Sequence, residues 1–174
     1  MQICLIRRNR CLGVIALSFL ALSSLQAQEK VYKSQMTGFS VTFPGRPEVL
    51  TNSTAVGEIE KAEYEDEMGN VYTLWVLQPE GNNAISKANA GRVLEDRLWA
   101  FVERHGGETQ GRKTGLKSWK VKQYLGVRKE FQGTEGPIHY CITIVDNMIF
   151  ELYVRGKEGF DKKAAKAFCK SVTD

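Results

Sequence analysis

The chain has 174 residues, of which 43% are hydrophobic and 25% charged, a balance typical of a folded domain rather than of a disordered chain or a protein with many membrane spans. Its formal net charge is +4, but three of the 24 basic residues and none of the 20 acidic residues lie in the first ten positions. The rest of the chain is therefore nearly neutral, which gives no electrostatic reason to expect a nucleic acid partner.

The first 27 residues have the three-part order of a secretory signal peptide. Three arginines precede an apolar stretch over 11–25, and the small residue Ala27 ends the segment. The apolar stretch is shorter than the ~20 residues that a membrane-spanning helix needs. We expect cleavage after Ala27, export of residues 28–174 to the periplasm or the medium, and no stable membrane span afterwards. The alternative is an uncleaved N-terminal anchor.

Alternation of apolar and polar residues predicts strands in the first part of the expected mature chain. Residues 28–37 are polar and indicate an irregular lead-in. Turn residues rich in proline, glycine and asparagine separate the apolar runs that follow. Four strands are expected, at 39–43, 48–54, 57–66 and 71–77.

The clearest helix spans residues 85–105. Its apolar residues recur at steps of three and four, and Gly106 and Gly107 follow directly. His105 stands at the end of this helix, where the helix dipole favours a cation. We interpret His105 as a structural residue.

The second half is rich in strand patterns and ends in a helix. Asp146 and Asn147 indicate a tight hairpin turn, with a positive φ expected at Asn147, and Phe150 and Leu152 should both face the core. Strands are expected at 108–115, 118–124, 126–132, 138–145 and 149–154, and a helix at 160–171.

This order of elements predicts an α+β fold. Strands joined by hairpins favour an antiparallel sheet, here of about six to seven strands, with the two helices packed on it. No repeat or linker divides residues 28–174, which we interpret as a single domain.

Two stretches resemble a known family. Residues 38–47 (GFSVTFPGRP) look like the opening of many small exported bacterial proteins, and residues 128–131, 142–156 and 167–172 look like their closing pattern. On these motifs the chain resembles the PsbP-like superfamily, which also includes the Mog and DcrB types. The resemblance implies α/β/α layers and no common enzymatic activity, since members include accessory, binding and envelope proteins.

The two cysteines outside the leader can meet if the last helix packs on the sheet. Cys141 lies in an expected strand and Cys169 in the expected C-terminal helix. Export permits a disulfide between them. Cys169 also stands where the family pattern has an ordinary apolar residue, a departure that favours the bridge. The alternative is two separate buried thiols that act as small hydrophobic residues.

No established catalytic motif is present, and we expect no enzymatic activity, no cofactor and no metal site. His139 and Cys141 share a strand face, which leaves a thiol-dependent enzyme as an alternative, although neighbours two apart on one strand point in parallel. A metal-dependent hydrolase would need an acidic run to converge on one ion, whereas a solvated strand face explains that run more simply. The acidic run comprises Glu58, Glu60, Glu63, Glu65, Asp66 and Glu67.

A basic stretch with interleaved aromatic residues is the candidate binding surface. It includes Trp119, Lys120, Lys122 and Arg128, and Trp119 is the tryptophan we expect to be most exposed. An acidic envelope protein or an anionic polymer would suit this charge. We therefore expect an exported, non-enzymatic domain that binds or assists another envelope component. The alternatives are an envelope enzyme or a structural scaffold, with the oligomeric state left open.

Overall fold

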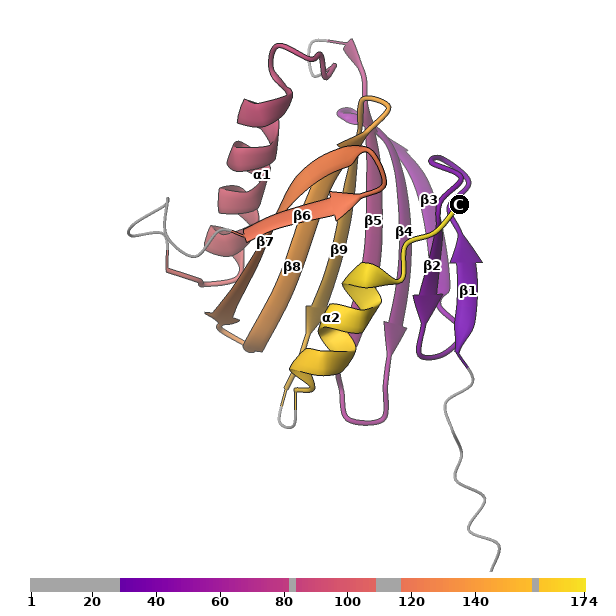
Figure 1. The fold of residues 1–174 in the computed structure, drawn as a ribbon, viewed down its shortest axis with the longest axis vertical. Helices are drawn as coiled ribbons and strands as arrows, with labels where there is room; N and C mark the ends of the chain where they lie inside the picture. Colours follow the sequence, from indigo (N-terminus) through magenta and orange to yellow (C-terminus); the bar gives the residue numbers. More distant parts are fainter. Residues whose placement is uncertain (1–28, 82–83, 109–116, 158–159) are drawn as a thin grey trace, which may run out of the picture.

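A computed structural model describes residues 29–81, 84–108, 117–157 and 160–174, and the expected leader lies outside these ranges (Figure 1). Its main sheet has seven strands, all antiparallel to their neighbours, in the order β3-β4-β5-β9-β8-β7-β6. These strands are β3 (Glu48–Thr54), β4 (Gly57–Glu65), β5 (Val71–Pro79), β6 (Lys117–Val121), β7 (Tyr124–Gly133), β8 (Gly136–Val145) and β9 (Met148–Arg155). A separate hairpin pairs β1 (Lys30–Lys33) with β2 (Ser40–Phe43).

One face of the main sheet is covered by helix α1 (Ala90–Arg104). Four residues near the end of this helix are buried, in keeping with its three- and four-residue apolar spacing. Phe101 stacks on Tyr140 of β8, with ring centroids 3.9 Å apart. Ile142 and Ile149 belong to the same core cluster, because alternate residues of β8 and β9 point to this face.

The opposite face is covered by helix α2 (Lys162–Lys170) together with the β1–β2 hairpin, which gives the α/β/α layers seen in Figure 1. The Asp161 side chain caps α2 by accepting hydrogen bonds from the backbone N–H groups of Lys163 and Ala164. Phe168 packs edge-on against Phe43 of β2, with ring centroids 5.0 Å apart. This contact ties the helix and the hairpin into a single core.

The structure confirms the predicted α+β fold class and several local features. Phe150 and Leu152 are fully buried on the face covered by α2. Asp146 and Asn147 both have positive φ, at 48° and 68°, as a tight hairpin turn requires. No helix within the described ranges is long and apolar enough to cross a membrane.

Three predictions need correction or lie beyond the structure. The lead-in over 28–37 is not wholly irregular, because it contributes β1. The predicted helix over 85–105 is shorter at its start, and α1 begins at Ala90. The strand predicted over 108–115 falls almost entirely on residues 109–116, which lie outside the described residues.

Candidate functional site

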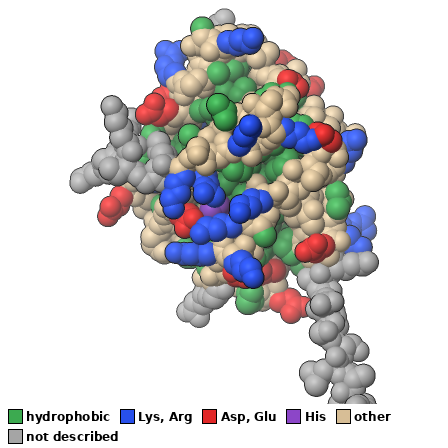
Figure 2. Space-filling view, in the orientation of Figure 1, with side chains coloured by type: hydrophobic (Ala, Val, Ile, Leu, Met, Phe, Trp, Pro, Cys, Tyr) green, Lys and Arg blue, Asp and Glu red, His purple; other side chains and the backbone are tan. Residues whose placement is uncertain are grey.

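Five cationic side chains surround one cavity where β6, β7 and α2 meet. The cavity has a volume of about 290 Å³. Figure 2 shows Lys and Arg side chains gathered over this part of the molecule. We call this site the basic pocket, and its cationic residues are Lys120, Lys122, Arg128, Lys166 and Lys170. Among the described residues that line it, none is acidic.

The charges of the basic pocket are only partly neutralised. Lys122 forms an ion pair with the carboxylate of Asp174, and Lys166 Nζ lies 3.4 Å from Glu130 Oε1. The Nε atom of Arg128 is buried and has no hydrogen-bond partner within the described residues. A buried donor without a partner costs about 1–3 kcal/mol, so an acceptor entering the pocket would remove that cost.

The structure places all four predicted binding residues in the lining of the basic pocket, but it overturns the expected exposure of Trp119. Only 7% of Trp119 is exposed, and its indole N–H donates a hydrogen bond of 3.2 Å to the backbone carbonyl of Cys169. Because side chains alternate along β6, Lys120 points outward and Trp119 points toward the core. Trp119 therefore forms part of the pocket wall and is no free aromatic surface.

The sequence interpretation missed the contribution of α2. Lys166 and Lys170 reach the basic pocket from this helix, and Lys162 continues the same row. The signal was present, because lysines four residues apart lie on one side of a helix. Their participation could be recognised only once α2 was placed beside β6 and β7.

The acidic run also differs from its predicted form. Glu60 is fully buried, although we expected the run to be a solvated strand face. Its carboxylate accepts four hydrogen bonds, one from Tyr32 of β1 and three from Ser34, Gln35 and Met36 directly after this strand. Glu63 meets the expectation better, with partial exposure and an ion pair of 2.8 Å with Lys61.

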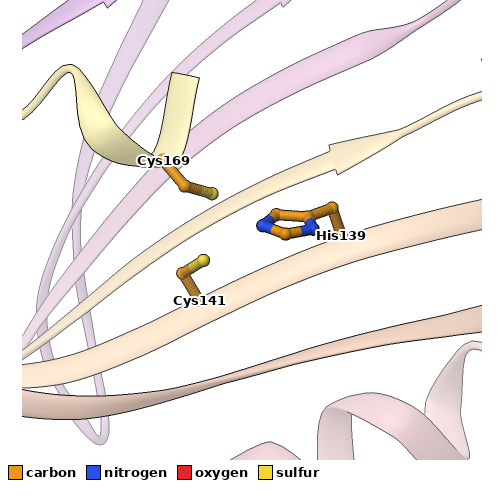
Figure 3. Close-up of side chains that lie close together, drawn as sticks. All are labelled: His139, Cys141 and Cys169. Atoms are coloured by element: carbon orange, nitrogen blue, oxygen red, sulfur yellow. The ribbon is translucent and has the colours of Figure 1, made fainter. Parts of the chain in front are cut away.

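A second cluster, buried beneath α2, joins His139, Cys141 and Cys169, which we call the His-Cys-Cys cluster. Figure 3 shows the imidazole ring and both sulfur atoms pointing toward one another. The metal-binding atoms of the three side chains all lie within 4.8 Å of one another. Their exposed fractions are only 1%, 0% and 3%, respectively. Both cysteines are free thiols in this structure, so the disulfide between them remains a prediction.

The surroundings of the two thiols shift their pKa values in opposite directions. Burial raises the pKa of Cys141, but interactions with Cys169, His139 and Arg128 outweigh burial and lower this pKa from 9.0 to about 7. Burial, together with the interaction with Cys141, raises the pKa of Cys169 well above its ordinary value. The pair therefore releases its first proton more readily than an isolated buried thiol does.

These properties meet one condition of a thiol-dependent enzyme and fail another. A nucleophilic cysteine needs a low pKa, which Cys141 has, and it also needs access to a substrate. Cys141 is fully buried, so no substrate carbon can approach its sulfur in this arrangement.

His105 follows the last residue of α1, as predicted, but its charge is not favoured there. Burial lowers the pKa of His105, and the charges of Arg155 and Arg104 lower it further. The negative charge of Glu135 acts in the opposite direction but does not reverse the shift.

Comparisons with known proteins show similarity at the level of fold. No protein-family model and no curated protein matches the chain. The structure is similar to that of cyanobacterial PsbP (CyanoP) from Synechocystis sp. PCC 6803, with a TM-score of 0.57 and 9% sequence identity, covering 95% of this chain and 97% of that chain. The protein thus has a PsbP-like fold.

A protein from Bacteroides thetaiotaomicron VPI-5482 is also similar, with a TM-score of 0.45 and 13% identity. That similarity covers 84% of this chain and 48% of the other chain, and it is too low to support a conclusion. Similarity of fold does not transfer an activity. The function must be argued from the side chains.

Proposed function

We propose that this protein is an exported, non-catalytic accessory domain that binds an anionic component of the cell envelope through the basic pocket. The observation that carries the proposal is the convergence of five cations on one cavity, where the buried Nε of Arg128 has no hydrogen-bond partner in the described part of the chain. A guanidinium is suited to bind a carboxylate or a phosphate, because its N–H groups match the geometry of their oxygens.

The size of the basic pocket and the charges beside it favour a polymer with repeated anionic groups. A cavity of about 290 Å³ accommodates one acidic group and its immediate neighbours. Lys166 and Lys170 line the cavity, and Lys162 extends their row along α2 beyond it. Successive lysines of this row are about 6 Å apart along the helix axis, given a rise of about 1.5 Å per residue. One anionic group would occupy the pocket while its neighbours along the polymer meet the row.

The test compares two triple variants with the same change in net charge. The pocket variant carries three substitutions in the pocket lining, Lys120→Glu, Lys122→Glu and Lys170→Glu. Fluorescence anisotropy would measure binding of labelled polyphosphate, labelled polyglutamate and labelled neutral dextran at several salt concentrations. The control variant carries Lys33→Glu, Lys87→Glu and Lys157→Glu, which lie outside the pocket lining.

We expect the pocket variant to bind polyphosphate at least about tenfold more weakly, equivalent to about 1.4 kcal/mol, and the control to differ little from wild type. Equal loss in both variants would contradict the proposal, since it would reflect net charge alone. If the protein binds polyglutamate but not polyphosphate, the ligand is an acidic protein segment and not a phosphate polymer.

A pull-down from the envelope fraction of the organism itself would then test the location of the partner. We expect wild type and the control to retain the same envelope component, and the pocket variant to lose it. Retention by all three proteins would place the binding surface elsewhere.

A further inference from the structure

The His-Cys-Cys cluster has the composition and spacing of a metal site. Among the described residues it is the one group of three or more His, Cys, Asp or Glu side chains whose ligand atoms come this close. In a trigonal site with bonds of about 2.3 Å, neighbouring ligand atoms lie about 4.0 Å apart. The ligand atoms of the cluster lie within 4.8 Å of one another, so each pair needs to approach by less than about 1 Å.

Glu130 contacts the imidazole of His139 in the way that a carboxylate behind a metal-binding histidine does. His139 Nδ1 lies 3.4 Å from Glu130 Oε1 on the neighbouring strand. The other ring nitrogen, Nε2, is buried and has no hydrogen-bond partner within the described residues. Metal-binding histidines commonly use one nitrogen for a carboxylate and the other for the ion. Nε2 is therefore the nitrogen available for a metal.

The ligands and their burial select the kind of ion. Thiolates are soft donors and imidazole binds copper and zinc well, so this set favours Cu(I) or Zn²⁺ over Mg²⁺, Ca²⁺ or Mn²⁺. A structural zinc site almost always has four protein ligands, and a catalytic one keeps an open position for water. This cluster offers three ligands in a buried setting, and Cu(I) is stable with three ligands.

We propose that His139 Nε2, Cys141 Sγ and Cys169 Sγ form a buried, three-coordinate site for Cu(I). One Cu–N bond and two Cu–S bonds form on binding. The two S–H bonds break and their protons pass to solvent, while copper stays in its +1 state throughout. The bound unit carries one negative charge, and Arg128, paired with Cys141 across β7 and β8, lies in position to offset it.

The experiment measures Cu(I) binding without oxygen. The full chain would carry Cys4→Ser and Cys11→Ser, so that Cys141 and Cys169 are its only thiols. After reduction, the protein would be titrated with Cu(I) buffered by the competing chelator bicinchoninate. We expect one tightly bound Cu(I) per chain, a new ultraviolet absorption from sulfur-to-copper charge transfer, and a higher melting temperature.

Variants identify the ligands and their support. Cys141→Ala, Cys169→Ala and His139→Asn should each lower Cu(I) affinity, and His105→Asn, which changes the other histidine, should not. Glu130→Gln should lower the affinity by roughly 10–100-fold, as is typical when the carboxylate that holds a metal-binding histidine is replaced. Circular dichroism would verify that each variant folds. If a ligand variant does not fold, the Glu130→Gln variant and the wild-type titration decide the result.

Three outcomes would overturn the proposal. A reduced wild-type chain that binds no Cu(I) and forms a Cys141–Cys169 disulfide on exposure to air would show that the two thiols pair instead. Tight binding of Zn²⁺ with no binding of Cu(I) would exclude the three-coordinate copper site. Cu(I) binding that survives both cysteine substitutions would place the ion elsewhere. The pocket variant defined above should still bind Cu(I), because its substitutions lie outside the cluster.

Discussion

The buried carboxylate of Glu60 should anchor the segment after β1 to the main sheet. Oε1 accepts hydrogen bonds from the Tyr32 hydroxyl (2.8 Å) and the Gln35 backbone N–H (3.2 Å). Oε2 accepts from the Ser34 hydroxyl (3.1 Å) and the Met36 backbone N–H (2.9 Å). Burial and the bond to Glu60 raise the pKa of Tyr32, which keeps its hydroxyl a donor.

Glu60→Gln is the sharpest perturbation, because it preserves shape while replacing one acceptor oxygen with an NH₂ group. Each carboxylate oxygen serves one hydroxyl and one backbone N–H. The hydroxyl can rotate, whereas the backbone N–H of Gln35 or Met36 must face the new NH₂. An unsatisfied buried donor costs about 1–3 kcal/mol, and a hydrogen bond to a charged group is worth about 1.5–3 kcal/mol. We expect Glu60→Gln to lower the free energy of unfolding by about 2–4 kcal/mol.

Urea denaturation followed by circular dichroism would measure this loss, and hydrogen exchange would locate it. The control is Glu58→Gln, an exposed residue on the same face of β4, which should change stability by no more than about 0.5 kcal/mol. Exchange protection should fall first over residues 30–43, which contain β1 and β2. Equal urea midpoints for the two variants would refute the anchoring role of Glu60.

Three further predictions concern the core, one turn and acid stability. Phe150→Ala and Leu152→Ala should each cost about 2–5 kcal/mol in urea denaturation, because both side chains are fully buried; unchanged midpoints would contradict the register of β9. Asn147→Val should cost about 1–2 kcal/mol because φ is 68° there, while Asn147→Gly should be nearly neutral; equal stabilities would contradict the turn geometry. Burial lowers the pKa of His105 in the folded protein, so the unfolded chain binds this proton more readily. The free energy of unfolding should therefore fall as the pH drops from 6.5 through the lower pKa of the folded state. His105→Gln should make this fall less steep.

Much of the fold could be predicted from local patterns. The hairpin that joins β8 to β9 was predictable, because two apolar runs flank the turn residues Asp146 and Asn147. Cys141 and His139 were correctly placed on one strand face, since residues two apart in a strand share a face. Such features depend on neighbours that are close in sequence.

The errors concern residues whose environment is made by distant segments. Glu60 belongs to an acidic run that looks solvated, and its burial depends on donors located 24 to 28 residues earlier in the chain. Trp119 has lysine at positions 117 and 120, yet its burial depends on the phase of an edge strand and on a carbonyl 50 residues away. Neither environment leaves a signal in the local sequence.

Helix α2 takes part in both proposed sites. Cys169 belongs to the His-Cys-Cys cluster and also lines the basic pocket, together with Lys166 and Lys170. Residues three and four apart are neighbours on one side of a helix, so Cys169 and Lys166 lie side by side on α2. They differ in burial, because Cys169 is buried whereas 43% of the Lys166 side chain is exposed. The pocket variant changes surface lysines and removes no metal ligand, so it should lose anion binding and keep Cu(I), whereas Cys169→Ala should lose Cu(I) and keep the five cations that bind the anion.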